Sequence, residues 1–368
     1  MKYSEFQQRR LSVYLAGIAQ PTVAGDCLPD VAKLIIPVGA LESRGNILKR
    51  IDAAFDFGIN SRYNTYFRQA QLHFLSVTPP PRFSVVATDN RHRFIVPAIL
   101  KSREIADRDA KGVLLPLNWH RHWPQLGELA RNDRPFEEKD DKLIWRGATT
   151  GCFNKAKPDD VYSPRFWVSQ LADLSPGIDV KFSKRAKDRG GSKQFPVEAV
   201  QARLGAAMSM PEQLASKFIL CLEGNDVASG LKWMMGSFST VIMPPPTCET
   251  WFCEGELVAW EHYVPVKSDL SDLNEIYEWC LSNSAKCKEI ALHGRAFAAQ
   301  FIDARTEYAI IQDVVRSYLE YSDVDVTFSR AERFRQFWNH LGLRYDRRKF
   351  WRQFDDIKRG FGPVPGSS

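Results

Sequence analysis

The stretch KFILCLEGNDVASGLKWMM, residues 217–235, is the part of the sequence that most clearly indicates the fold of this chain. Its first half is the apolar run Phe218–Leu222, and Gly224 then opens a turn of small and polar residues. An apolar run that ends at a glycine is typical of a buried strand, and Asn225 or Asp226 can cap a following helix. Strand, tight turn and helix in succession are the unit from which α/β proteins with parallel sheets are built.

Similar elements lie on both sides of this stretch. Short apolar runs bounded by Gly, Pro and Asp predict strands at residues 32–38, 83–88, 112–117, 143–145, 178–182, 218–222 and 240–243. Longer segments predict helices at residues 227–235, 272–281, 285–301 and 306–321. Because strands alternate with helices, we expect an α/β fold with parallel sheets whose strands are buried on both faces.

The composition is that of a globular protein: 368 residues, 44% hydrophobic and 26% charged, are enough for two domains. No apolar run approaches the roughly 18–20 residues of a membrane-spanning helix, and Glu5 stands where an export signal would be apolar, so we expect a soluble, cytoplasmic protein. The seven cysteines are odd in number and form no C-x-x-C pair, which argues against a disulfide scaffold or a zinc site and for small buried thiols.

The positive charge is concentrated in the tail. Residues 328–360 hold ten Lys and Arg against four Asp and Glu, a balance of +6 that equals the formal net charge of the whole chain. Such a tail suits an anionic membrane surface or an acidic polymer, and a solvated helix face explains it equally well. No recognised nucleic-acid-binding motif accompanies it, so nucleic acid is not an expected partner.

The turn after Gly224 has the composition of a phosphate site. Small residues let a ligand approach backbone N–H groups at the positive end of a helix, and Lys232 adds a cation one turn later. The same small residues can serve close packing alone. Because the stretch matches neither G-x-G-x-x-G nor a P-loop, it indicates neither a dehydrogenase nor an NTPase.

A second strand and glycine turn is LIWRGATTG, residues 143–151, with Arg146 at the end of the strand. Arg165, in the motif SPR, begins the next helix-like segment. A guanidinium at either place can clamp a phosphate through its planar fork. The alternative for both residues is a surface arginine on a loop.

The pattern around the histidines gives little support for an acid–base or metal-ligand role. His262 lies between Glu and Tyr in EGELVAWEHYVPV, residues 254–266, where a hydrogen-bonded structural role is the usual one. His120 and His122 are spaced like metal ligands on a strand, but no acidic residue or cysteine accompanies them. We therefore expect no metal and no cofactor.

Taken together, three ordered blocks within residues 143–302 resemble the family 90 glycosyltransferases, and most closely their bacterial lipopolysaccharide branch. The family also includes fungal capsule-associated xylosyltransferases and animal protein O-glucosyltransferases. The blocks are RGATTG with SPR, KFILCLEGNDVASGLKWMMGSFSTVIM, and EGELVAWEHYVPVKSDLSDL followed by EIALHGRAFAAQF.

The resemblance implies a GT-B architecture, in which two Rossmann-like domains with parallel sheets face each other across a cleft. The acceptor-side domain would be residues 1–138, ending in the polar stretch Arg131–Asp141, and the nucleotide-sugar domain residues 139–322. Residues 323–368 would form basic amphipathic helices that return to the N-terminal domain, with an apolar stripe of Phe334, Phe337, Trp338 and Leu341.

The implied reaction is an inverting, metal-independent transfer from a UDP-sugar to a saccharide acceptor in lipopolysaccharide or another cell-envelope glycan. The acceptor would be a glycan or glycolipid, and the basic tail would contact anionic lipid at the inner face of the bacterial inner membrane. The rival interpretation is a catalytically inactive carbohydrate-binding or assembly protein with the same fold. The identity of the sugar is left open.

The resemblance also implies a set of donor-binding residues: Arg146, Gly147, Thr149, Arg165, Glu223, Gly224, Ala228, Ser229, Gly230 and Lys232. Animal members have an arginine between the serine and the lysine of this stretch, where Gly230 and Leu231 stand here. Arg165, Lys232 or Arg146 must then supply the positive charge for the diphosphate.

Inverting transfer needs one carboxylate that accepts the proton of the acceptor hydroxyl. The resemblance implies an Asp at the end of a strand in the N-terminal domain, and Asp89 ends the run Phe83–Thr88. The proline of the animal motif is missing around it. A turn-forming or capping role is the alternative for Asp89, and Asp107 or Asp109 would be the next candidate base.

Overall fold

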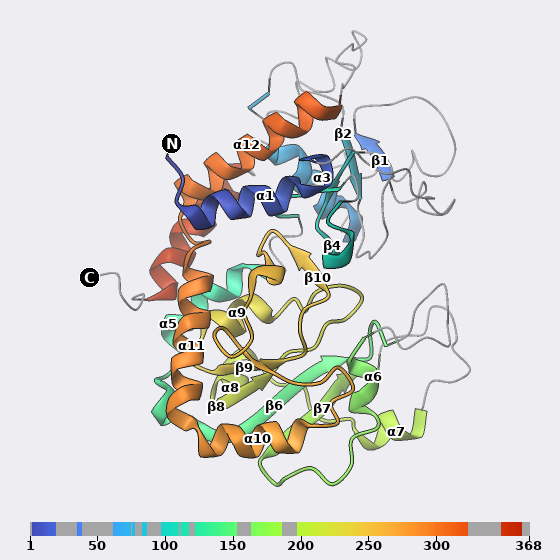
Figure 1. Ribbon diagram of the computed structural model, residues 1–368, viewed down its shortest axis with the longest axis vertical. Helices are drawn as coiled ribbons and strands as arrows, with labels where there is room; N and C mark the ends of the chain where they lie inside the picture. Colours follow the sequence, from blue (N-terminus) through green and yellow to red (C-terminus); the bar gives the residue numbers. More distant parts are fainter. Residues whose placement is uncertain are drawn as a thin grey trace. The chain divides into compact units, whose positions relative to one another are not determined.

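The computed structural model describes residues 2–19, 35–38, 62–74, 76–77, 83–86, 97–109, 112–117, 122–152, 163–185, 197–322 and 347–362 (Figure 1). The chain forms two compact units, each of three segments. Unit 1 contains Met1–Arg121, Cys248–Cys253 and Asp303–Asp356, and unit 2 contains His122–Thr247, Glu254–Ile302 and Ile357–Ser368. The division into acceptor-side, donor and tail parts stays a prediction.

Unit 2 is built on a five-stranded sheet in the order β11-β9-β8-β6-β7, in which every pair is parallel. Its strands are β6 (Asp140–Ala148), β7 (Ile178–Lys184), β8 (Ser216–Leu220), β9 (Thr240–Met243) and β11 (Val264–Pro265). Every residue of β9 is buried, and so are four of the five in β8, as expected for central strands with both faces covered. The predicted α/β fold with a parallel sheet is thus confirmed.

Helices complete unit 2. They are α5 (Leu129–Asn132), α6 (Arg165–Val168), α7 (Val197–Ala202), α8 (Met210–Leu214), α9 (Leu231–Gly236), α10 (Leu273–Ser282) and α11 (Ser284–Ala299). Short 3₁₀ turns lie at Pro124–Glu128, Phe136–Glu138 and Glu254–Glu256.

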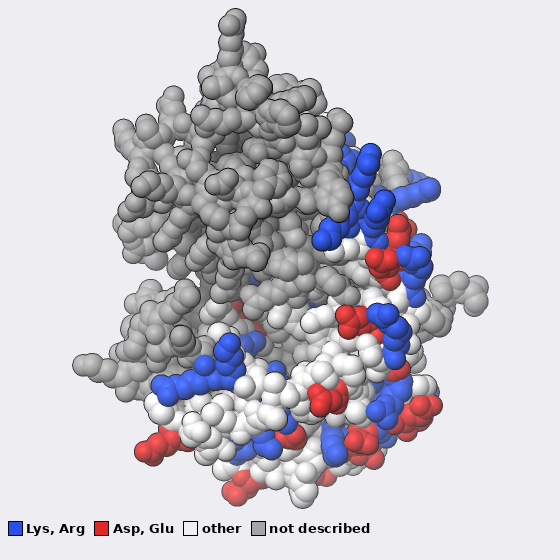
Figure 2. All heavy atoms as spheres, turned by 180° about the vertical axis from the view of Figure 1, so that it is seen from behind, with Lys and Arg blue, Asp and Glu red and all other residues white. Residues whose placement is uncertain are grey.

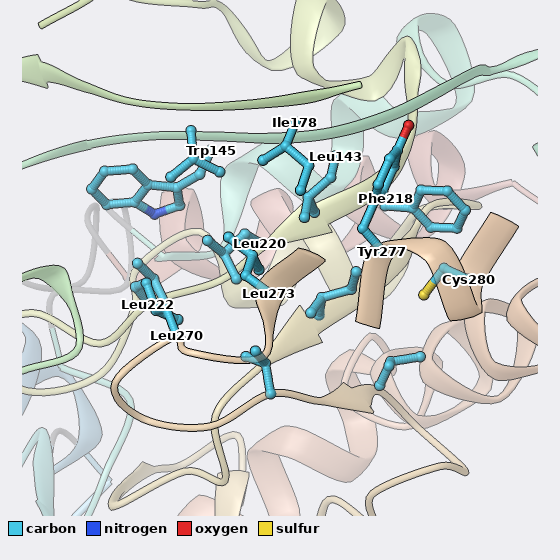
Figure 3. Packing of buried hydrophobic residues seen from close by; sticks show 14 of the residues in the cluster. Leu143, Trp145, Ile178, Phe218, Leu220, Leu222, Leu270, Leu273, Tyr277 and Cys280 are labelled. Carbon is cyan, nitrogen blue, oxygen red and sulfur yellow. The ribbon is translucent and has the colours of Figure 1, made fainter. Parts of the chain in front are cut away.

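The core of unit 2 lies between the sheet and α10 (Figure 3). Leu143 of β6 and Phe218 of β8 belong to one buried cluster with Leu273 and Tyr277 of α10. The Tyr277 hydroxyl donates to the Asp141 carbonyl at 2.8 Å, and its ring packs edge-on against Phe218 at 6.1 Å. The hydroxyl and the ring of Tyr277 together fix α10 against the start of β6.

Unit 1 holds a four-stranded sheet in the order β1-β2-β3-β5, made of β1 (Ile35–Val38), β2 (Phe83–Val86), β3 (Ala98–Leu100) and β5 (Gly112–Leu114). β1 is antiparallel to β2, and the other pairs are parallel. A separate antiparallel pair joins β4 (Ser102–Glu104) to β10 (Cys248–Thr250). The helices are α1 (Glu5–Ala19), α3 (Arg62–His73), α12 (Ala304–Ser322), the 3₁₀ turn Ile105–Asp107 and residues 347–356 of a helix that runs over residues 347–361.

Buried charge pairs join the distant segments of unit 1. Arg10 of α1 donates from both terminal nitrogens to the two carboxylate oxygens of Glu307 in α12, each at 2.7 Å, and its side chain is fully buried. Glu249 of β10 accepts from Arg103 at 3.0 Å and from Arg108 at 2.9 and 2.6 Å. Two-pronged pairs of this kind fix both distance and orientation, so they hold α1, α12, β4 and β10 in register.

The predicted strands and helices are mostly found, with shifted ends. The main difference is α9, which begins at Leu231 because residues 227–230 continue the loop. Helices α1 and α3 and strands β3, β4, β10 and β11 are absent from the predicted set, because strands of two or three residues carry no periodic signal and the apolar face of α1 is interrupted by Arg10.

The polar stretch of residues 131–141 contributes to a core as well as to the surface. This stretch lies within unit 2, where Phe136 joins the core cluster and Lys139 forms a buried ion pair with Asp133. The six cysteines among the described residues are buried thiols that form no disulfide with one another, as predicted, and Cys27 lies outside those residues. No helix in the described ranges is long and apolar enough to span a membrane.

His73, at the end of α3, makes unit 1 sensitive to acid. Burial lowers the pKa of His73 to about 4; its Nε2 lies 3.4 Å from the Pro116 carbonyl and its ring 5.7 Å from that of Phe350. A histidine in the unfolded chain has a pKa near 6.5, so as pH falls the unfolded state takes up a proton at His73 before the folded state does. The free energy of unfolding therefore falls by about 3 kcal/mol as pH drops from about 6.5 to 4.

Urea unfolding between pH 7 and pH 4.5 measures this loss, and we expect a smaller pH slope in His73→Phe. The exposed His293→Gln variant is the control and should keep the wild-type slope. Equal slopes in wild type and His73→Phe would assign the acid sensitivity to other groups.

Candidate functional site

Two glycine loops meet at one edge of the sheet of unit 2. Residues 149–152 follow β6 and residues 221–230 follow β8, and since these neighbouring strands are parallel, their carboxyl ends share that edge. Gly151 has φ +81°, and a Cβ there would lie 2.2 Å from the carbonyl carbon of Gly224. Backbone therefore packs on backbone, and only glycine fits at residue 151.

Arg165, the first residue of α6, ties the two loops together. Its Nε and Nη2 donate to the Leu222 carbonyl at 3.3 and 3.1 Å, and its Nη1 donates to the Ala148 carbonyl at 3.2 Å and to the Thr150 hydroxyl at 2.9 Å. Its Cζ lies 3.1 Å from the position of a Cβ on Gly224. The predicted SPR motif and the glycine turn thus come together.

Ser163 completes this arrangement from the other end of the SPR motif. Its hydroxyl donates to the Glu223 carbonyl at 2.8 Å and accepts from the Arg165 amide at 3.2 Å. The Gly224 amide donates to the Asp226 carbonyl at 3.0 Å, which closes the turn. The loop after β8 is consequently held by side chains of a segment 60 residues earlier in the chain.

Two of the predicted donor residues, Glu223 in the second loop and Lys232 in α9, take part in contacts with a carboxylate. The Glu223 carboxylate accepts from the Thr247 amide at 2.9 Å and from its hydroxyl at 2.5 Å. Lys232 of α9 is fully buried and lies 2.5 Å from a carboxylate oxygen of Glu254, which is also buried. Thr247 and Glu254 both belong to unit 2, like the side chains that they bind.

Arg146 has different partners. Its Nη2 lies 2.6 Å from a carboxylate oxygen of Asp179 on β7, and its Nε donates to the Ala206 carbonyl at 3.0 Å. Arg165 and Arg146 therefore serve different neighbours, Leu222 in one case and Asp179 in the other.

The other predicted donor residues have backbone roles. A Cβ on Gly147 would lie 2.4 Å from the Trp145 ring. Thr149 is buried and its amide donates to the Lys184 carbonyl at 3.2 Å. Ala228 is buried, its carbonyl accepts from the Leu231 amide at 3.2 Å, and Ser229 and Gly230 are partly exposed just before α9.

Cys221 is the cysteine in the loop that follows β8. Burial raises the pKa of the Cys221 thiol to about 12, so this thiol stays neutral. His262 accepts from the Val258 amide at 2.9 Å, and burial lowers its pKa, which confirms its structural role.

Asp89 lies outside the described residues, and Asp107 and Asp109 belong to unit 1 just after β4. Across the described ranges no three His, Cys, Asp or Glu side chains group as metal ligands.

The fold and the site define an α/β protein whose candidate ligand loops lie at the carboxyl edge of a parallel sheet. Comparison with known proteins is more specific. Residues 178–333 match the family described as Glycosyl transferase family 90. This match confirms the predicted resemblance to that family; it covers the second and third of the ordered blocks, while RGATTG and SPR, at residues 146–151 and 163–165, lie before it.

Individual relatives agree with this. The O-glucosyltransferase LpsA of Dichelobacter nodosus is 31% identical over 223 residues, which cover 61% of this chain and 62% of that protein. Human protein O-glucosyltransferase 3 is 28% identical over 179 residues, covering 48% of this chain and 33% of that protein. The chain thus spans less than two thirds of the length of these relatives.

The sequence analysis does not predict the residues that bind the site's side chains. Glu254 binds Lys232 from 22 residues away, and Thr247 binds Glu223 from 24 residues away. Thr150 belongs to the motif RGATTG, but its bond to Arg165 is not predicted. One signal was available for Glu254: a lysine within an otherwise apolar helix needs a buried carboxylate somewhere in the fold.

We expect Glu254→Gln to lower the free energy of unfolding by about 3–5 kcal/mol, because it removes the carboxylate charge beside the buried Lys232 ammonium. The double variant Lys232→Met/Glu254→Leu should lose less, since it removes both charges. Urea unfolding measures both. Asp140→Asn, in the exposed pair with Lys142, is the matched control and should change stability little. A Glu254→Gln variant as stable as wild type would contradict the buried pair.

Proposed function

We propose that this protein is an inverting, metal-independent glycosyltransferase with a GT-B arrangement, which moves a sugar from a UDP-sugar to a saccharide acceptor in lipopolysaccharide or another cell-envelope glycan. One observation carries the proposal: the two glycine loops and Arg165 meet at the carboxyl edge of a parallel sheet, within the blocks that resemble family 90. Loops at this edge are the usual place for a nucleotide ligand in open α/β sheets.

In this proposal the loop after β8 receives the diphosphate. A Cβ on Gly224 would lie 3.1 Å from the Arg165 guanidinium carbon, so the planar fork of Arg165 lies directly beside the backbone of this loop. Lys232 and Arg146 each lie against a carboxylate, Glu254 and Asp179, whose negative charges offset theirs. Arg165 donates to carbonyls at the ends of both strands, Leu222 and Ala148, and it is the cation that we assign to the developing charge on the leaving UDP, which a fixed side chain stabilises without reorganisation.

The names of the relatives suggest the sugar. Two of them are O-glucosyltransferases, one bacterial and one human, so UDP-glucose is the first donor to test. We place the enzyme in the cytoplasm, with peripheral contact at the inner membrane, where a glycolipid acceptor would be presented. No cofactor is required by the proposal.

The base remains Asp89. An inverting transfer needs one carboxylate near the acceptor hydroxyl, which accepts its proton while the hydroxyl oxygen attacks the anomeric carbon and UDP leaves. Asp89 is three residues beyond the end of β2, the strand that pairs with β3 in the sheet of unit 1.

We expect Arg165→Ala to weaken UDP binding by about 10-fold to 100-fold, or about 1.5–3 kcal/mol, because a charge-paired fork is lost. Arg165→Lys keeps the charge and loses the fork, so its affinity should be intermediate. Isothermal titration calorimetry with UDP measures both, and Arg131→Ala, an exposed arginine on α5, is the control. Wild-type affinity in Arg165→Ala would remove this residue from the donor site.

Asp89→Asn should lower turnover of UDP-glucose by roughly 100-fold or more while UDP binding persists, because the amide keeps the shape but accepts no proton. Release of UDP in EDTA-treated buffer measures turnover and tests metal independence in the same assay. Asp140→Asn is a matched control that should remain active. Loss of activity in Asp107→Asn or Asp109→Asn instead would move the base there. A wild type that binds UDP-sugars and neither hydrolyses nor transfers them would favour the inactive binding protein.

A further inference from the structure

A hollow in unit 1 gathers three arginines. Its volume is about 480 Å³, and it is lined by Ala304, Arg347, Arg348, Trp351, Arg352 and Asp355. Three positive charges and one negative charge leave a formal balance of +2. Lys and Arg side chains also gather at the upper right of the described surface in Figure 2. The basic tail, residues 328–360, therefore contributes residues 347–355 to a concave surface.

The hollow has a fixed wall. Arg347 donates to the Tyr308 hydroxyl at 3.0 Å and lies over the Tyr308 ring at 5.3 Å, and Trp351 packs edge-on against the same ring at 5.4 Å. Ala304, the first residue of the 19-residue helix α12, adds the positive end of that helix to the lining. These contacts hold one arginine and one aromatic ring in place before any ligand arrives.

The other two arginines are not neutralised. Arg348 and Arg352 are exposed on the helix over residues 347–361, and within the described part of the chain neither forms an ion pair. They are four residues apart, so their like charges face each other on one side of the helix, an arrangement that costs stability unless an anion lies between them. The opposite side of this helix buries Phe350 and Phe354, which fixes the rotation that presents the arginines.

We propose that this hollow is an anion site that binds a phosphate group. Forked guanidinium groups match phosphate oxygens in geometry as well as in charge, and a concave site with an aromatic wall suits a discrete group better than a flat charged surface does. The phosphate can be carried by a lipid headgroup or by a soluble sugar phosphate, since both present the same oxygens. The site is built from residues of unit 1 alone and does not depend on the proposed glycosyltransferase activity.

The test compares three double variants of the full chain. Arg348→Ala/Arg352→Ala removes the two unpaired forks, Arg348→Lys/Arg352→Lys keeps charge without forks, and Lys349→Ala/Lys358→Ala is the matched control, with the same loss of charge on the same helix. The probes are glucose 6-phosphate and pyrophosphate by calorimetry, and phosphatidylcholine vesicles with and without phosphatidic acid by sedimentation. Circular dichroism verifies that each variant is folded.

We expect wild type to bind at least one phosphate probe, the alanine pair to weaken that binding at least 10-fold, the lysine pair to weaken it less, and the control pair to stay within about twofold. Binding of soluble probes identifies a sugar phosphate as the source, and binding only to vesicles with phosphatidic acid identifies a headgroup. A wild type that binds none of the probes overturns the proposal. Equal loss in the control pair overturns it too, because it would show a diffuse basic surface.

Discussion

Parallel pairing of β6 with β8 is the constraint on which the site of unit 2 depends. Parallel strands end at the same edge, so the loops after them must lie side by side however far apart they stand in the chain. That closeness explains the glycine at residue 151, whose φ of +81° and contact with Gly224 leave no room for a side chain. It also explains Arg165, whose guanidinium reaches carbonyls from the ends of both strands.

Buried charge is the second recurring device, and it serves the two units in the same way. Arg10 with Glu307 and Arg103 with Glu249 join helices and strands of unit 1, and Lys232 with Glu254 joins a helix to a loop in unit 2. Removing a charge from water costs several kcal/mol, so such a pair is stable only in one geometry. A short segment can thereby be held in a defined position.

The segment Cys248–Cys253 shows how this device works on the chain. It belongs to unit 1, where Glu249 is held by two arginines and the Trp251 carbonyl accepts from the Tyr14 hydroxyl. The residues just outside it, Thr247 and Glu254, bind Glu223 and Lys232 of the candidate site in unit 2. Polar contacts of this kind therefore hold residues 249 and 251 within unit 1, and residues 247 and 254 within unit 2.

The α/β class, the parallel strands and the resemblance to family 90 were predictable from the chain alone, because apolar runs, glycine turns and ordered motifs are local features of a sequence. The sequence also brought Arg165, Glu223 and Gly224 together as candidates. The partners of individual side chains depend on the tertiary structure. Lys232 is buried against Glu254, Arg146 lies against Asp179, and Phe136 belongs to a core. Which side chains meet across 20 to 60 residues follows from strand order and register, and no local pattern in the chain records those.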